Sequence, residues 1–270
     1  MEHALAAARA AGADQADAVL VESDSLEARV RDETVDFVKQ ARERTLGIRA
    51  LVGGPDGFRS AVTSTSDLEG EAVATMAGEA VALAKETAAD AAAGLPEGGF
   101  ESDVADLGLC APEDRDVGVD ARIEDAAQCE RAARGCDPRI ANSEGSQVGS
   151  AFSHVVYGNS AGFVGEYDTT SHSLFSEPIA RENGSMQRDY WMTVGRRLAA
   201  LEAPEAVGRR AAERALRRLG ARRVPTCEVP VIFDPLTAPS LLRQLAGCVS
   251  GYAIYRQASF LAGKLGEEIA

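Results

Sequence analysis

The sequence predicts an α+β fold in which an N-terminal layer of helix, strand meander and helix precedes a β-rich middle region with flanking helices, and the start of an incomplete C-terminal domain follows. Three observations predict this class. Residues 26–31 alternate apolar and polar side chains, residues 53–57 read Gly-Gly-Pro-Asp-Gly between two β-patterned runs, and residues 67–89 carry apolar side chains at helical spacing.

The first elements of the chain are short and easily delimited. Residues 3–11 are rich in alanine and stop at Gly12, which predicts a short helix with a glycine end. An apolar strand is expected at 18–22, and the alternating strand at 26–31 continues with the same period of two through 35–39.

A hairpin is the next element that the pattern predicts. Residues 45–52 and 58–65 are β-patterned and flank the glycine-rich turn. A phosphate-binding loop is the alternative, but such loops open a helix and this one leads into a strand. Asp67 is a favourable N-cap for the helix that follows, which we expect to run to about Ala89.

The rest of the chain alternates between helical and β-rich segments. Residues 90–117 resemble a linker, residues 119–134 a helix, and residues 140–197 a β-rich stretch with several turn signals. A helix is expected from Pro204 to Gly220, with proline at its first position.

The last part of the sequence predicts a short buried strand at 229–233 and a helix over 236–262, broken at Ser250-Gly251. No closing element follows, so the final domain is expected to be unfinished.

We place the domain boundaries at 1–100 for an N-terminal α/β domain, 101–225 for a β-rich middle domain with helices, and 226–270 for the beginning of a truncated C-terminal domain.

The composition is that of a globular protein with an acidic surface. Lysine and arginine number 28 against 42 acidic residues, a formal net charge of −14, which disfavours direct nucleic-acid binding. The five cysteines have no C-x-x-C spacing. Because the sequence also lacks a signal-peptide pattern and an apolar run of about 20 residues, we expect a cytoplasmic protein that does not bind membranes.

Positive charge gathers in one segment. A helix there would carry a solvated arginine face interspersed with glutamates, or alternatively a patch for a nucleic acid or an acidic partner. The arginines are Arg209, Arg210, Arg214, Arg217, Arg218, Arg222 and Arg223.

Five short motifs occur in a characteristic order. They are Gly47-Ile48-Arg49, Asp137-Pro138-Arg139-Ile140, Asn159-Ser160-Ala161-Gly162-Phe163, Pro204-Glu205-Ala206-Val207-Gly208, and the run from Pro225 to Pro235. In this order the chain resembles the TldD/PmbA family, also labelled modulators of DNA gyrase, and within it the PmbA (TldE) type.

The resemblance implies a cytoplasmic, heterodimeric peptidase assembly of TldD-type and PmbA-type chains that degrades or processes peptides. It also implies that this chain is truncated at its C-terminus, because family members continue well past the equivalent of Ala270.

TldD-type chains carry His-Glu-x-x-x-His on a helix, where two histidines bind zinc and the glutamate polarises a zinc-bound water. Residues five apart lie about 140° apart on an ideal helix, so that motif needs a distorted helix or reaching side chains. The resemblance aligns its three positions with Arg243, Gln244 and Cys248. A guanidinium cannot ligate a cation and a carboxamide cannot act as a base. We therefore expect no catalytic residue and no metal in this chain, and zinc in the TldD-type partner.

Other polar residues offer no substitute site. His3, His154 and His172 have no ligand spacing and are expected to be surface or structural residues. The acids Glu166 and Asp168 are i,i+2 neighbours that could form a dyad or simply a solvated strand edge. No Gly-x-Ser-x-Gly motif occurs.

Several functions remain open from the sequence. The chain is a non-catalytic partner subunit of a TldD-type zinc metallopeptidase, an independent protein-binding module that modulates DNA gyrase or another partner, or a metallopeptidase in its own right. The first of these functions, that of a partner subunit, also allows self-association and requires an apolar interface. The apolar residues that could contribute to it are Tyr252, Ile254, Tyr255, Phe260 and Leu261.

Overall fold

A computed structural model describes residues 1–98 and 105–269 of the chain. It contains two compact units, Met1–Ala221 and Arg222–Ala270, each of which is described by itself. The α+β class predicted from the sequence is confirmed.

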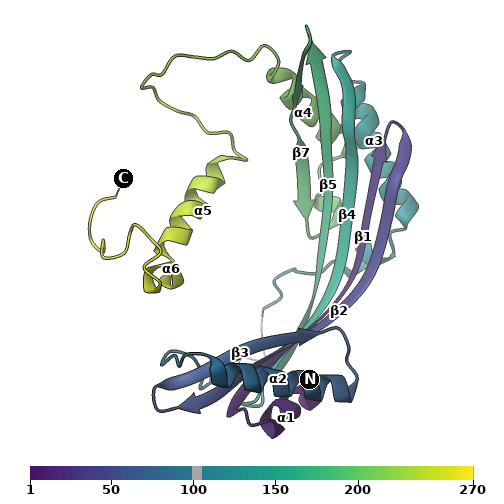
Figure 1. The fold of residues 1–270 in the computed structure, drawn as a ribbon. Coiled ribbons are helices and arrows are strands. Elements are labelled where there is room, and N and C mark those ends of the chain that lie inside the picture. Colours follow the sequence, from purple (N-terminus) through teal and green to yellow (C-terminus); the bar gives the residue numbers. More distant parts are fainter. Residues whose placement is uncertain (99–104, 270) are drawn as a thin grey trace. The chain divides into compact units, whose positions relative to one another are not determined.

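The first unit is organised around one antiparallel sheet with long strands (Figure 1). Within the described residues the sheet has the order β3-β2-β1-β4-β5-β6, and β7 pairs with β5 beside β6. The strands are β1 Gln15–Arg31, β2 Thr34–Gly54, β3 Gly57–Thr65, β4 Ile140–Asn159, β5 Val164–Glu182, β6 Ser185–Arg188 and β7 Trp191–Gly195. Strands from the predicted first and second domains therefore share one sheet.

Helices cover the two ends of this sheet, with α1 and α2 at one end and α3 and α4 near the other (Figure 1). Two short 3₁₀ segments, η1 and η2, lie in the connections. The bounds are α1 Glu2–Ala10, α2 Gly70–Glu86, η1 Pro112–Asp116, α3 Val119–Arg134, η2 Leu198–Ala200 and α4 Pro204–Arg217.

The sheet carries a separate apolar core at each end. Ala16 and Ala18 of β1 are buried beneath α1 and α2, whereas Ala28 and Val30 of the same strand are buried with side chains of α3 and α4. All four have even numbers, and side chains two apart in a strand share a face. Both helix pairs therefore pack on the face of the sheet that carries the even-numbered residues of β1. The middle of that face, between the two helix pairs, carries polar residues.

The glycine-rich turn joins β2 and β3 as a hairpin, as predicted, with Gly54 paired to Gly57. The prediction of one uniform strand pattern through residues 26–39 was wrong, because the chain reverses between β1 and β2 at Asp32 and Glu33. Both residues have positive φ, 51° and 60°, which is the geometry of a tight hairpin turn. The buried carboxylate of Glu130 holds this turn, accepting a hydrogen bond of 3.0 Å from the Asp32 N–H.

Three local expectations need correction. The helix α2 begins at Gly70, and Asp67 instead closes the preceding turn by accepting a 2.9 Å hydrogen bond from the Glu69 N–H. Residues 229–233 are not a buried strand: Ile232 is 97% exposed, and no described strand pairs with this segment. Arg214 is not solvated, because it packs over the Trp191 ring and lies 3.4 Å from Asp189.

The second unit contains α5, Ala238–Val249, and α6, Gly251–Tyr255. The break at Ser250 was predicted, and its hydroxyl caps α6 by accepting a hydrogen bond from the Ala253 N–H. The second helix ends at Tyr255, earlier than the sequence indicated. The part of the predicted linker at 99–104 lies outside the described residues.

Candidate functional site

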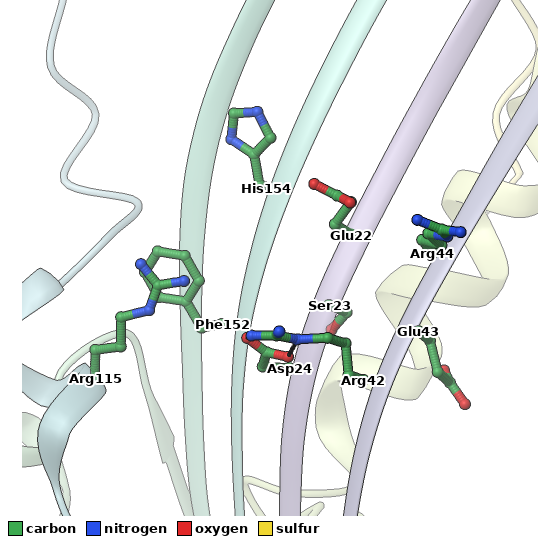
Figure 2. A pocket seen from close by; sticks show the side chains of 9 residues that line it. All are labelled: Glu22, Ser23, Asp24, Arg42, Glu43, Arg44, Arg115, Phe152 and His154. Carbon is green, nitrogen blue, oxygen red and sulfur yellow. Dashed lines mark hydrogen bonds and ion pairs between the residues drawn. The ribbon is translucent and has the colours of Figure 1, made fainter. Parts of the chain in front are cut away.

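A groove of about 580 Å³ crosses the polar middle of the sheet, between the two helix-covered ends (Figure 2). Its walls come from β1, β2 and β4, which the register of the sheet places side by side, and from η1. The lining residues are Glu22, Ser23, Asp24, Arg42, Glu43, Arg44, Arg115, Phe152 and His154.

Complementary charges face each other across the strands of this groove. Asp24 lies opposite Arg42 in the β1–β2 register, and Arg42 donates two hydrogen bonds to its carboxylate, at 2.6 and 2.9 Å. This hydrogen bonding lowers the pKa of Asp24 below its ordinary value. In the next row Glu22 lies opposite Arg44. The acidic chain thus balances its charge locally in the groove.

Arg115 of η1 reaches over the groove and stacks on Phe152, with 4.0 Å from its guanidinium carbon to the ring centroid (Figure 2). Cation–π contacts of this kind favour arginine over an aromatic face. The contact joins the connection that precedes α3 to the exposed middle of the sheet.

His154 is bordered by two carboxylates. Its Nδ1 donates to Asp168 Oδ1 at 2.7 Å, and its Nε2 lies 3.7 Å from Glu166 Oε2. The sequence pattern missed this grouping, because only the β4–β5 register brings the three side chains together. No hydroxyl or thiol in the described part of the chain hydrogen-bonds to His154, so the trio is not a nucleophile–base arrangement.

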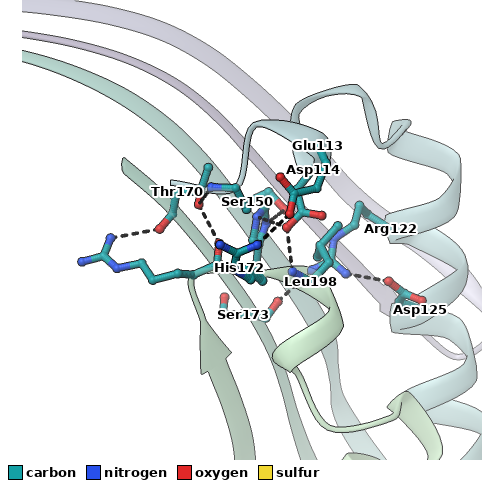
Figure 3. A network of polar contacts seen from close by, with 12 residues as sticks. Glu113, Asp114, Arg122, Asp125, Ser150, Thr170, His172, Ser173 and Leu198 are labelled. Carbon is teal, nitrogen blue, oxygen red and sulfur yellow. Dashed lines mark hydrogen bonds and ion pairs between the residues drawn. The ribbon is translucent and has the colours of Figure 1, made fainter. Parts of the chain in front are cut away.

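Buried polar contacts connect η1, α3 and β5 (Figure 3). His172 is 4% exposed; its Nδ1 is 3.0 Å from Ser150 Oγ and its Nε2 is 3.4 Å from Asp114 Oδ2. Asp114 also accepts a 2.8 Å hydrogen bond from the Leu198 N–H. Arg122, 3% exposed, donates to Asp125 and to the Ser173 carbonyl.

His172 makes folding stability depend on pH. Burial lowers the pKa of His172 below its ordinary 6.5, against the opposing effect of Asp114. Below about pH 6.5 the unfolded chain therefore binds a proton that the folded chain does not bind, so the free energy of unfolding should decrease over a pH window that begins near 6.5 and extends downward. In His172→Gln, urea unfolding at several pH values should show a shallower decline over this window. A decline equal to that of the unsubstituted chain would contradict the assignment.

The three residues aligned with the zinc motif all lie on α5. Gln244 Nε2 is 3.5 Å from Cys248 Sγ, one turn further along the helix. Arg243 and Gln244 are exposed, and Cys248 is half-buried. The structure thus brings Gln244 and Cys248 together, with the amide donating to the thiol sulfur.

The predicted interface residues divide into two groups within the second unit. Tyr252, Tyr255 and Phe260 are exposed by 69%, 80% and 73%. Ile254 and Leu261 instead line a small apolar pocket of the same unit. Only the three aromatic residues are therefore free to form an outward-facing patch, and their role as an interface stays a prediction.

The resemblance to the TldD/PmbA family implies zinc, but the residues at the aligned positions do not fit that metal. A guanidinium and a thiol stand at the positions of the two histidine ligands and a carboxamide at that of the glutamate, which leaves the thiol as the sole conventional zinc ligand among the three. Among residues 1–98 and 105–269, no group of three or more histidine, cysteine or acidic residues is arranged to hold a metal ion.

We predict that the purified, chelator-washed chain retains no stoichiometric zinc. Elemental analysis by plasma mass spectrometry should give far less than one zinc per chain, and Arg243→His should raise zinc retention because it supplies an imidazole ligand on the helix that carries the Cys248 thiol. One tightly held zinc per unsubstituted chain would contradict the prediction.

Comparison with known proteins places the chain in a family. Residues 16–84, 112–219 and 226–270 match, in order, the models of PmbA/TldA metallopeptidase domain 1, the central domain and the C-terminal domain. The chain belongs to the PmbA/TldD metallopeptidase family.

Within this family the matching curated relatives are PmbA proteins. The chain is 40% identical over 212 residues to the metalloprotease PmbA of Escherichia coli O157:H7, covering 78% of this chain and 47% of that protein. It is 33% identical over 255 residues to a metalloprotease PmbA homologue of Haemophilus influenzae, covering 94% and 55%. The chain spans about half the length of these relatives.

Solved structures share the fold. A Bacteroides thetaiotaomicron protein named "putative modulator of DNA gyrase" superposes with a TM-score of 0.88 at 27% identity, covering all of this chain and 60% of that one. TldE from Thermococcus kodakarensis superposes with a TM-score of 0.80 at 22% identity, covering 100% and 59%, and at this identity shows the fold alone. In the described residues, no helix is long and apolar enough to span a bilayer.

Proposed function

We propose that this chain is a non-catalytic, PmbA/TldE-like partner subunit of a TldD-type zinc metallopeptidase that degrades or processes peptides in the cytoplasm. The proposal is carried by the residues Arg243, Gln244 and Cys248, which the resemblance aligns with the zinc motif, in a chain whose relatives are called metalloproteases. A subunit in which the aligned positions do not provide zinc ligands would act by shaping or gating a site that another chain supplies.

The second unit supplies a surface suited to such a partner. Large aromatic side chains bury much apolar area and are enriched at the centres of protein interfaces. Tyr252, Tyr255 and Phe260 are exposed within this unit, and Arg256 stacks on Tyr252 with its guanidinium carbon 5.3 Å from the ring centroid. Arg256 also donates a 2.7 Å hydrogen bond to the Tyr252 hydroxyl, which fixes the ring.

Association with the TldD-type chain of the same organism tests the proposal. The two chains should co-elute in size-exclusion chromatography, and the triple variant Tyr252→Ser, Tyr255→Ser, Phe260→Ser should weaken the complex by roughly tenfold or more. The matched control Val35→Ser, Val62→Ser, Leu83→Ser changes exposed apolar residues of the first unit and should leave the affinity unchanged. Absence of any complex would overturn the proposal.

A second candidate is a protein-binding module that acts on DNA gyrase, which the name of the Bacteroides relative motivates. The net charge of −14 favours contact with the protein over contact with its DNA. The same chromatography with gyrase subunits in place of the TldD-type chain distinguishes the two candidates.

A further inference from the structure

The outer edge of β5 is unpaired near its start. On that side β7 pairs with residues 172–176 and β6 with residues 179–182, and no strand in the described part of the chain pairs with residues 164–169. The Thr170 N–H already donates outward, to the Leu109 carbonyl at 3.0 Å. Backbone groups of a strand alternate in direction, and the β4–β5 register is unbroken here, so the N–H and C=O of Glu166 and Asp168 point to the same open edge.

An apolar groove of about 680 Å³ lies along this edge. The Phe163 ring folds over Gly165, where a side chain would meet it at 2.9 Å, and its centroid is 6.0 Å from that of Tyr157. Tyr167, 51% exposed, continues the apolar wall, and Leu107 of the preceding connection, 69% exposed, borders it. Tyr157, Gly165 and Tyr167 share one face of the sheet, as their register and spacing require.

The other face of the same edge is acidic. Glu166 and Asp168 alternate with the residues just described and have side chains that are 70% and 47% exposed. Asp106 adds a third carboxylate to the groove, and no lysine or arginine is among its lining residues. An added strand would therefore meet carboxylates on one face and aromatic rings on the other.

We propose that the 164–168 edge of β5 binds an extended peptide of about five residues in which basic and apolar side chains alternate. The peptide continues the sheet by hydrogen bonding to Glu166 and Asp168, the mode known as β-strand addition. Its basic side chains lie toward the two carboxylates, and its apolar side chains lie toward Tyr157, Phe163 and Tyr167. A role for this subsite in capturing peptides for a peptidase rests on the proposed function.

Fluorescence anisotropy on this chain alone tests the proposal. The probe is a labelled seven-residue peptide in which lysine alternates with valine and leucine. Three matched peptides separate the contributions of charge, alternation and backbone hydrogen bonding. The first has glutamate in place of lysine, the second has the same composition but consecutive lysines, and the third is N-methylated at alternate residues. All three should bind several-fold more weakly than the probe. If any of the three bound as tightly as the probe, the corresponding part of the proposal would be wrong: the charge preference, the alternation of side chains, or the backbone hydrogen bonding to β5. Any of these results would overturn the proposal.

A variant of the chain locates the site. Glu166→Gln with Asp168→Asn should weaken probe binding roughly three- to tenfold, whereas Glu79→Gln with Glu86→Gln on α2 should not. Circular dichroism checks that both variants keep their fold. Unchanged binding by the first variant would overturn the assignment.

The competing occupant is the same edge of a second copy of this chain. In sedimentation, the isolated chain should not form a dimer that dissociates when the probe peptide is added. A dimer of this kind would overturn the proposal and indicate self-association through this edge. The peptide measurements involve no TldD-type chain, so their failure would leave the proposed function intact, and failure of the two chains to associate would leave this subsite intact.

Discussion

Gly208→Ala should lower the free energy of unfolding by about 1–3 kcal/mol, toward the upper end of that range, because the new methyl group has no room. A Cβ at this position of α4 would lie 2.1 Å from the Cys129 carbonyl oxygen and 3.0 Å from the Ala133 nitrogen. Both are backbone atoms of α3, so relief requires the two helices to separate. That separation would open the core shared by Cys129, Val207 and the sheet.

The matched control for this prediction is Gly78→Ala on α2, a helical glycine at which an added Cβ meets nothing within 4 Å. Alanine is the better helix former by about 1 kcal/mol, so this variant should be as stable as the unsubstituted chain or more so. Urea unfolding followed by circular dichroism measures both. Similar stability of the two variants would mean that α3 and α4 are not packed as closely as the structure shows.

Arg122→Ala should destabilise the chain by about 3 kcal/mol, because it removes an almost fully buried guanidinium and leaves a buried acceptor without its donor. The Arg122 side chain is 3% exposed, and burial lowers the pKa of its guanidinium despite the nearby Asp125. Its loss would leave the Ser173 carbonyl of β5 without its 3.1 Å donor. Asp125 is 37% exposed and regains water, which limits the cost on that side.

The matched control is Arg131→Ala on the same helix. Arg131 pairs with Glu124 at 2.6 Å, but both side chains are about half exposed, at 50% and 54%. Exposed ion pairs contribute at most about 1 kcal/mol, so thermal and urea unfolding should change little. If the two variants lost the same stability, the account of the network in Figure 3 would be wrong.

Local chemistry accounts for what the sequence predicted well. The hairpin at Gly54 and Gly57 follows from turn residues, and the helix predicted at 119–134 agrees with α3. The turn at Asp32 and Glu33 contains no glycine, and it is held by Glu130, which is distant in sequence. The local sequence therefore did not predict this reversal of the chain. Residues 229–233 have the apolar pattern of a strand, but a strand exists only where another pairs with it.

The polar groupings were harder to predict, because register decides them. His154 and Asp168 are brought together by the pairing of β4 with β5, and Asp24 meets Arg42 through the pairing of β1 with β2. A one-residue slip would place each side chain on the opposite face, and spacing alone does not fix the register of such long strands. The alternation of Glu166 and Asp168 with Tyr167 was visible in the sequence, but the open edge beside them was not.

Peptide hydrolysis tests the central claim most directly. An unstructured peptide is incubated with this chain, with the TldD-type chain of the same organism, and with both together at equal concentration. Hydrolysis should be absent with this chain alone and should require or strongly increase with the pair, and Arg243→Ala with Gln244→Ala should leave the rate of the pair unchanged. Hydrolysis by this chain alone, abolished by a chelator, would show that it holds a catalytic metal and would contradict its role as a non-catalytic subunit.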